Sequence, residues 1–224
     1  MPTVSRSESQ CADNVDFSLY LITDRYQTAG RPLMDVVRAA LQGGVRAVQL
    51  REKDLADDAL YDLAVSLRSL TREFGARLLI NRRIDICRAV GADGVQLGIE
   101  GISVAEARRT LGRQMLIGYS AHSVAEACSA EAAGADFVTF SPVFHTPSKA
   151  AYGEPVGLDR LREACATLAI PVFALGGIKK ETIAEVMAVG ARGIALISAI
   201  IAARNPATEA LSLLKTIEQH VTHS

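Results

Sequence analysis

The sequence predicts a single (β/α)8 (TIM) barrel, a closed sheet of eight parallel strands that alternate with helices. The chain has 224 residues, of which 49% are apolar, and a small barrel of this kind needs about 200 to 250 residues. One short turn pattern recurs along the chain, and apolar runs of strand length alternate with stretches of helical spacing. This alternation indicates a parallel sheet, for which an open, doubly wound arrangement is the alternative to the barrel.

The recurring turn starts with glycine, passes through two or three residues and enters an apolar run. Glycine is typical of the residue that follows a helix, so each copy predicts the end of one helix and the start of a strand. The copies are about two βα units apart and begin at Gly44, Gly91, Gly134 and Gly190. The set of eight strands is completed by apolar runs over 19–22, 78–80, 115–118 and 171–175.

Between these strands, apolar residues recur three and four positions apart, which is typical of helices that pack one face on a sheet. A shorter helix is predicted between Asn81 and Gly91. The longer helices are predicted over 33–41, 59–70, 104–111, 124–132, 158–168, 183–189 and 208–217. We place residues 1–15, which are polar and of mixed charge, in a loose tail and residues 16–224 in one barrel domain.

Composition argues against several classes of protein. The 24 basic residues nearly balance the 25 acidic ones and there is no Trp, so the chain lacks the features of a nucleic-acid-binding protein. It has neither an apolar run of about 20 residues nor the apolar segment of a signal peptide, so we expect a cytoplasmic protein without membrane attachment. The four cysteines are too far apart in the sequence for a zinc-binding motif, so we expect no metal cluster from Cys11, Cys87, Cys128 and Cys165.

Two late segments are suited to phosphate. The segment 174–178 is an apolar run that leads into Gly176 and Gly177, and the segment 193–198 ends in Ile197 and Ser198. Glycines after a buried strand leave backbone N–H groups open to an anion, and a helix that starts after the next strand can add more. The last two strands of a (β/α)8 barrel commonly form such a site, so we predict that a phosphorylated ligand binds here.

Polar side chains follow the other predicted strands. In a barrel the carboxyl ends of the strands form the active-site face, so these side chains are candidates for one site. Cations outnumber anions among them, which suits a ligand with several phosphate charges. A histidine among them can both accept and donate a proton near neutral pH. The candidates are Gln49, Arg51, Lys53, Asn81, Arg82, Ser120, His122, Thr146, Ser148 and Lys149.

Several motifs in order resemble one enzyme superfamily, that of thiamine-phosphate synthase and its paralogue thiazole tautomerase. The match extends from about residue 19 to residue 200. It is carried by Gln49-Leu50-Arg51-Glu52-Lys53-Asp54, Asn81 followed by Arg83, Gly91-Ala92-Asp93-Gly94-Val95, Ser120-x-His122-Ser123, Pro142-Val143-Phe144-x-Thr146-x-Ser148-Lys149 and Gly176-Gly177-Ile178.

The resemblance implies two binding regions. Contacts to a pyrimidine diphosphate would come from Gln49, Arg51, Lys53 and Asn81, with Ser120 and Lys149 beside the leaving diphosphate. A thiazole phosphate would be held by Thr146, Ser148, Gly177, Ile197 and Ser198, with Gly176 in the same turn. In the synthase, the charge of the diphosphate is neutralised by basic side chains and by Mg²⁺ held on two aspartates.

The chain departs from this pattern at both metal positions. The family's Asn-Asp-Arg is Asn81-Arg82-Arg83, and its second aspartate is Gly101. Neither residue offers the oxygen that Mg²⁺ requires. The histidine that often precedes Leu-Gly in the synthase is Gln96. We therefore predict no metal and no cofactor, with Mg²⁺ needed only if synthase activity survives these changes.

The departures leave three functions open. We favour a metal-independent thiazole tautomerase, in which His122 moves the proton that aromatises the thiazole. The alternative is a thiamine-phosphate synthase in which Arg82 takes over part of the role of the metal. The third is a regulatory protein that binds a phosphorylated ligand without turnover. In each case the partner is a small phosphorylated heterocycle, the chain is a possible homo-oligomer, and residues 145–155 form a candidate lid.

Overall fold

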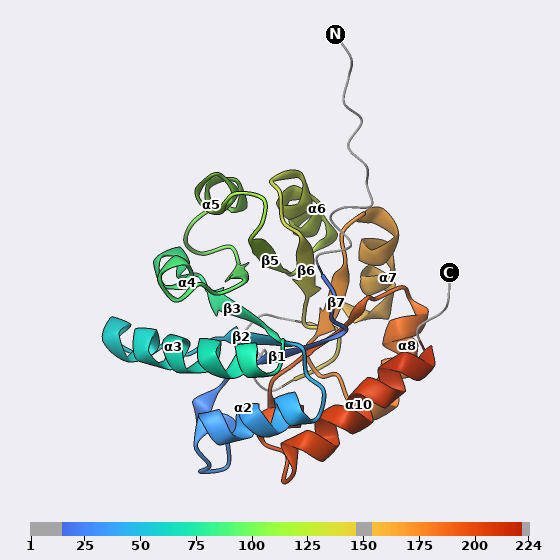
Figure 1. Cartoon of the computed structure of the whole chain (residues 1–224). Helices are drawn as coiled ribbons and strands as arrows, with labels where there is room; N and C mark the ends of the chain where they lie inside the picture. Colours follow the sequence, from blue (N-terminus) through green and yellow to red (C-terminus); the bar gives the residue numbers. More distant parts are fainter. Residues whose placement is uncertain (1–14, 147–153, 221–224) are drawn as a thin grey trace.

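Eight parallel strands form a closed barrel, in which each strand pairs with its neighbours in chain order (Figure 1). The computed structural model describes residues 15–146 and 154–220. The ring is closed by pairing of the first and last strands, with Leu19 beside Ile194. The (β/α)8 prediction is confirmed and the open sheet is excluded. The strands are β1 (Leu19–Ile22), β2 (Ala47–Leu50), β3 (Arg77–Asn81), β4 (Gly94–Leu97), β5 (Leu116–Ala121), β6 (Phe137–Phe140), β7 (Val172–Leu175) and β8 (Gly193–Leu196).

Helices surround the barrel and cover its outer face (Figure 1). Each predicted helix is present, with ends that differ from the prediction by a few residues at most. A four-residue helix, α9 (Ser198–Ile201), begins two residues after β8 ends, and in the described part of the chain short 3-10 turns lie at Arg25–Gln27 and Lys180–Thr182. The longer helices are α2 (Leu33–Gln42), α3 (Asp57–Glu73), α4 (Ile84–Val90), α5 (Val104–Leu111), α6 (Val124–Ala132), α7 (Gly157–Thr167), α8 (Ile183–Ala188) and α10 (Pro206–His220).

Serine side chains fix the start of two helices. The side chains of Ser103 and Ser123 precede α5 and α6, and each accepts a hydrogen bond from a backbone N–H three residues later, at 3.2 Å. These N–H donors belong to Glu106 and Glu126, whose carboxylates lie in the positively polarised first turn. The two strand-to-helix turns after β4 and β5 are therefore set locally, and both contribute residues to the site described below.

The interior of the barrel is filled by aromatic side chains. Phe17, Tyr20, Phe137 and Phe173 are at most 3% exposed, and their ring centroids lie 5.1 to 6.4 Å apart. Val15, which we assigned to the tail, is fully buried with them. Its burial places residue 15 in the barrel and not in the tail, because an apolar side chain gains free energy by packing in the interior.

A second, larger core lies between the outer face of the strands and the helices. The tail residues 1–14 lie outside the described part of the chain. Within the described part, no helix combines the length and apolar character needed to cross a membrane.

Candidate active site

The carboxyl ends of the strands surround a cavity of about 600 Å³. It is lined by residues at or just after the carboxyl ends of all eight strands, so the face predicted to carry the site does carry a large cavity. Ser148 and Lys149 lie outside the described residues. The other predicted site residues are all brought together in its wall: Gln49, Arg51, Lys53, Asn81, Arg82, Ser120, His122, Thr146, Gly176, Gly177, Ile197 and Ser198.

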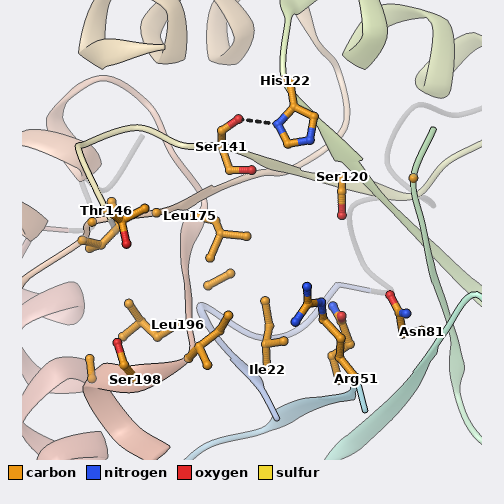
Figure 2. Close-up of a pocket in the computed structure, with 18 of the residues that line it drawn as sticks. Ile22, Arg51, Asn81, Ser120, His122, Ser141, Thr146, Leu175, Leu196 and Ser198 are labelled. Atoms are coloured by element: carbon orange, nitrogen blue, oxygen red, sulfur yellow. Dashed lines mark hydrogen bonds between the residues drawn. The ribbon is translucent and has the colours of Figure 1, made fainter. Parts of the chain in front are cut away.

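The cavity has two polar ends (Figure 2). We call the part around Arg51, Lys53, Asn81 and Arg82 the cationic end. The part around Thr146, Gly176, Gly177, Ile197 and Ser198 is the glycine end. Figure 2 shows Thr146 and Ser198 across the cavity from Arg51 and Asn81. The wall between the two ends includes the apolar side chains of Ile22, Leu175 and Leu196.

The glycine end depends on backbone that residues with a side chain rarely adopt. Gly176 and Gly177 both have positive φ, 95° and 66°. A Cβ added at Gly177 would lie 2.7 Å from the carbonyl oxygen of His145, which is closer than real contacts allow. The chain after β7 therefore passes tightly under the chain after β6, and Ser198 begins α9 beside it. Because glycine has no side chain, its backbone N–H groups can approach a phosphate closely.

The cationic end is crowded with positive charge. The pKa of the Lys53 ammonium is lowered, first by the Arg51 guanidinium, then by burial and by Arg82, while Glu100 opposes the shift. Arg82 Nη1 lies 2.6 Å from Glu100 Oε2. Neighbouring cations that lower the pKa of Lys53 indicate a site that would gain free energy from binding an anion.

A buried network of hydrogen bonds lies under the cationic end. Tyr20 donates to Gln96 Oε1 at 3.3 Å, and Gln49 Nε2 donates to the Tyr20 oxygen at 3.2 Å. Gln96 Nε2 in turn donates to Ser120 Oγ at 3.0 Å and to Thr139 Oγ1 at 3.3 Å. Burial raises the pKa of the Tyr20 hydroxyl, so this group stays protonated and remains a donor. The network holds Gln49 and Ser120, two of the predicted ligand residues, in fixed orientations.

Comparison with known proteins identifies the family. A family model described as thiamine monophosphate synthase matches residues 19–200. The chain belongs to the thiamine monophosphate synthase family. The resemblance predicted from the motifs is thereby confirmed.

Relatives in this family match nearly the whole chain. A Geobacter sulfurreducens protein named "Putative thiamine-phosphate synthase" is 60% identical over 200 residues, which are 89% of this chain and 94% of the relative. The thiamine-phosphate synthase of Syntrophomonas wolfei is 43% identical, over 92% of this chain and 99% of the relative. A solved structure, that of thiamine phosphate pyrophosphorylase from Pyrococcus furiosus, is 37% identical and has a TM-score of 0.84. The match covers 92% of this chain and 98% of the Pyrococcus chain.

The metal site implied by the resemblance to thiamine-phosphate synthase does not fit these side chains. The nearby carboxylates already interact with arginines: Glu52 accepts hydrogen bonds from Arg25, and Glu100 forms an ion pair with Arg82. No group of three His, Cys, Asp or Glu side chains suited to a metal ion occurs among residues 15–146 and 154–220. Mg²⁺ prefers several hard oxygen ligands, and a guanidinium occupies the position of one of them.

His122 lies on the wall between the two ends, after β5 (Figure 2). Its ring Nδ1 is 2.6 Å from the carbonyl oxygen of Ser141, so Nδ1 carries the hydrogen in this contact. Its backbone N–H donates to the Glu126 carboxylate at 2.8 Å. In the neutral ring Nε2 is then the atom that can accept a proton. This arrangement holds the imidazole at the cavity in one tautomer.

Three apolar residues of the cavity wall were not predicted. The apolar wall of Ile22, Leu175 and Leu196 consists of strand residues, and apolar strand residues carry no signal that separates a ligand contact from the core. Ser141 also lines the cavity, and its buried Oγ has no hydrogen-bond partner among the described residues. A buried hydroxyl without a partner is unusual and is available to a ligand.

The backbone at Arg82 leads to a prediction about stability. Its φ of 62° lies in the left-handed region, which asparagine adopts more readily than arginine or glutamine. Arg82→Asn is expected to have a free energy of unfolding about 1 kcal/mol higher than Arg82→Gln. Both variants lose the same charge and ion pair, so the comparison isolates the backbone. Urea unfolding followed by circular dichroism measures the difference, and equal midpoints would contradict it.

Proposed function

We propose that this protein is a thiamine-phosphate synthase, which joins a pyrimidine diphosphate to a thiazole phosphate. The observation that supports the proposal most strongly is a cavity with two polar ends and an apolar wall between them. Two phosphorylated heterocycles with their rings in contact need this arrangement, because each anionic group requires its own polar surroundings.

The reaction breaks one bond and forms one bond. The C–O bond between the pyrimidine methylene and the diphosphate breaks, and the thiazole nitrogen forms a C–N bond to the methylene carbon. At the cationic end, Arg51, Lys53 and Arg82 stabilise the negative charge that develops on the departing diphosphate. Gln49 and Ser120, which are oriented by the Gln96 network, lie beside them. Thr146 and Ser198 contact the phosphate of the thiazole at the glycine end.

The tautomerase that the sequence favoured uses less of this cavity. A proton transfer on one thiazole phosphate requires the glycine end and His122, but it has no need of three cations at the opposite end. The names of the relatives also favour the synthase. We therefore place the synthase first and retain the tautomerase as the function to be tested against it.

An assay of coupling separates the candidate functions. Purified protein is incubated with both substrates, with Mg²⁺ or with EDTA, and thiamine phosphate and diphosphate are measured together. The proposal expects equal amounts of the two products. In a parallel sample without pyrimidine diphosphate, thiazole absorbance reports aromatisation. Aromatisation without coupling would replace the proposal with the tautomerase, and binding without either reaction would replace it with a regulatory protein.

A variant of His122 adds a second test. His122→Asn retains an amide donor in the place of Nδ1, which contacts the Ser141 carbonyl, but it cannot carry a proton between substrate atoms. A synthase is expected to keep coupling within about tenfold, whereas a tautomerase that relies on this proton carrier would lose about 10²- to 10⁴-fold. Initial rates at saturating substrate measure the effect. A loss above about a hundredfold in coupling itself would contradict a reaction driven mainly by the charges of the cationic end.

A further inference from the structure

An ion pair joins Arg82, which occupies one of the two metal positions implied by the family resemblance, to Glu100, which directly precedes Gly101 at the other. Arg82 follows β3 and Glu100 follows β4, and both residues line the cationic end. Their side chains are 38% and 71% exposed, and the charged atoms are 2.6 Å apart. An exposed ion pair of this kind contributes little to folding, so it can be exchanged for another partner at small cost.

The backbone holds Arg82 in place. Its N–H donates to the carbonyl oxygen of Gln96, on β4, at 2.9 Å. Its left-handed conformation turns the chain sharply between Asn81, which ends β3, and Arg83. Arg82 lines the cavity, whereas Arg83 pairs with Asp57 and Asp85 and does not. The two adjacent arginines are thus separated, one toward the cavity and one toward the surface.

The charge at this end is not balanced. Among the described residues that line it, the cations Arg51, Lys53 and Arg82 face a single carboxylate, that of Glu100. A diphosphate carries several negative charges on oxygens that match the planar fork of a guanidinium. The end of the cavity that would need a divalent ion to accept diphosphate therefore already holds the positive charge on protein side chains.

We propose that Arg82 replaces the divalent metal at the diphosphate position, and that Glu100 holds the Arg82 guanidinium until diphosphate displaces it. The proposal rests on the proposed function for the identity of the ligand. It goes beyond that function in two respects. Diphosphate binds without a metal ion, and the Glu100 carboxylate competes with diphosphate for the Arg82 guanidinium. Removal of Glu100 then strengthens binding of the anion, which is the opposite of what a metal ligand would do.

Titration with inorganic diphosphate tests this directly, by isothermal calorimetry in EDTA and again with Mg²⁺. The wild-type protein is expected to bind in EDTA at least as tightly as in Mg²⁺. Arg82→Gln is expected to weaken binding about 10- to 100-fold, the effect of losing charge-assisted hydrogen bonds. Glu100→Gln is expected to tighten it about two- to fivefold, because a competing exposed ion pair is lost.

Two variants serve as controls. Arg83→Gln removes the neighbouring arginine, which does not line the cavity, and should leave diphosphate affinity unchanged. Arg82→Asp places a carboxylate beside Glu100, so binding in EDTA should be lost and a part of it should return with Mg²⁺. Circular dichroism spectra of all variants establish that they are folded.

Two results would overturn the proposal: wild-type binding that requires Mg²⁺, or Arg82→Gln and Arg83→Gln proteins with equal affinities. Neither result bears on whether coupling occurs. Coupling that depends on Mg²⁺ would refute metal replacement and leave the synthase intact. Metal-independent diphosphate binding through Arg82 without any coupling would support the inference about the site and refute the proposed function.

Discussion

Replacement of Arg51 by methionine is expected to lower kcat/KM for coupling by about 10²- to 10³-fold. The guanidinium lies at the cationic end, and its removal leaves the developing charge of the leaving diphosphate less stabilised. Methionine keeps an unbranched apolar stem but removes the charge. Because Arg51 is the main cause of the lowered pKa of Lys53, the variant also lets that pKa rise toward its ordinary value. Steady-state kinetics with varied pyrimidine diphosphate measures the loss.

A matched control is available on the outer surface. Arg38 lies on α2 and pairs with Glu73 at 2.8 Å, away from the cavity. Arg38→Met should leave kcat/KM unchanged, since an exposed pair of this kind contributes little to stability or to the site. A loss for Arg51→Met of less than about fivefold, with the control intact, would show that this cation is not used in the reaction.

Truncation of Phe137 is expected to have the largest effect on stability. Its ring is fully buried and packs edge to face on Phe17, Tyr20 and Phe173 inside the barrel. Phe137→Ala should lower the free energy of unfolding by about 3–5 kcal/mol, because the rigid strands cannot move in to fill the space. Chemical denaturation monitored by fluorescence or circular dichroism gives the value.

An exposed aromatic residue provides the comparison. Tyr61, on α3, is 41% exposed, and Tyr61→Ala is expected to change the free energy of unfolding by less than about 0.5 kcal/mol. If both variants lost the same small amount, the aromatic cluster would not be the tightly packed interior that its geometry indicates.

The fold was predictable because its signals are local. The strand over 19–22 and the helices over 104–111 and 124–132 were predicted to the residue from an apolar run and from helical spacing, and in the structure a serine caps each of the two helices. The glycines of the site were also predictable, because Gly176 and Gly177 are required by their own backbone conformation. Features of this kind depend on neighbours along the chain.

The remaining features of the site depend on neighbours in space. In the sequence, Gln96 is notable only because it replaces a histidine common in the synthase. In the barrel, its side chain forms hydrogen bonds with Tyr20 on β1 and with Ser120 on β5. Arg82 and Glu100 are 18 positions apart, and only the pairing of β3 with β4 brings them together. Spacing along the chain could identify each residue as a candidate but could not assign its partner.

The pairing of β8 with β1 has a consequence for the synthesis of the chain on the ribosome. The strand that begins at Gly193 is the last to be made, and until it pairs with β1 both edges of the sheet stay open. The cationic end, built on β2, β3 and β4, is complete in sequence long before Ser198 emerges. A nascent chain that has formed these strands carries half of its site on a sheet with exposed strand edges, and such edges are prone to aggregation until β8 pairs with β1.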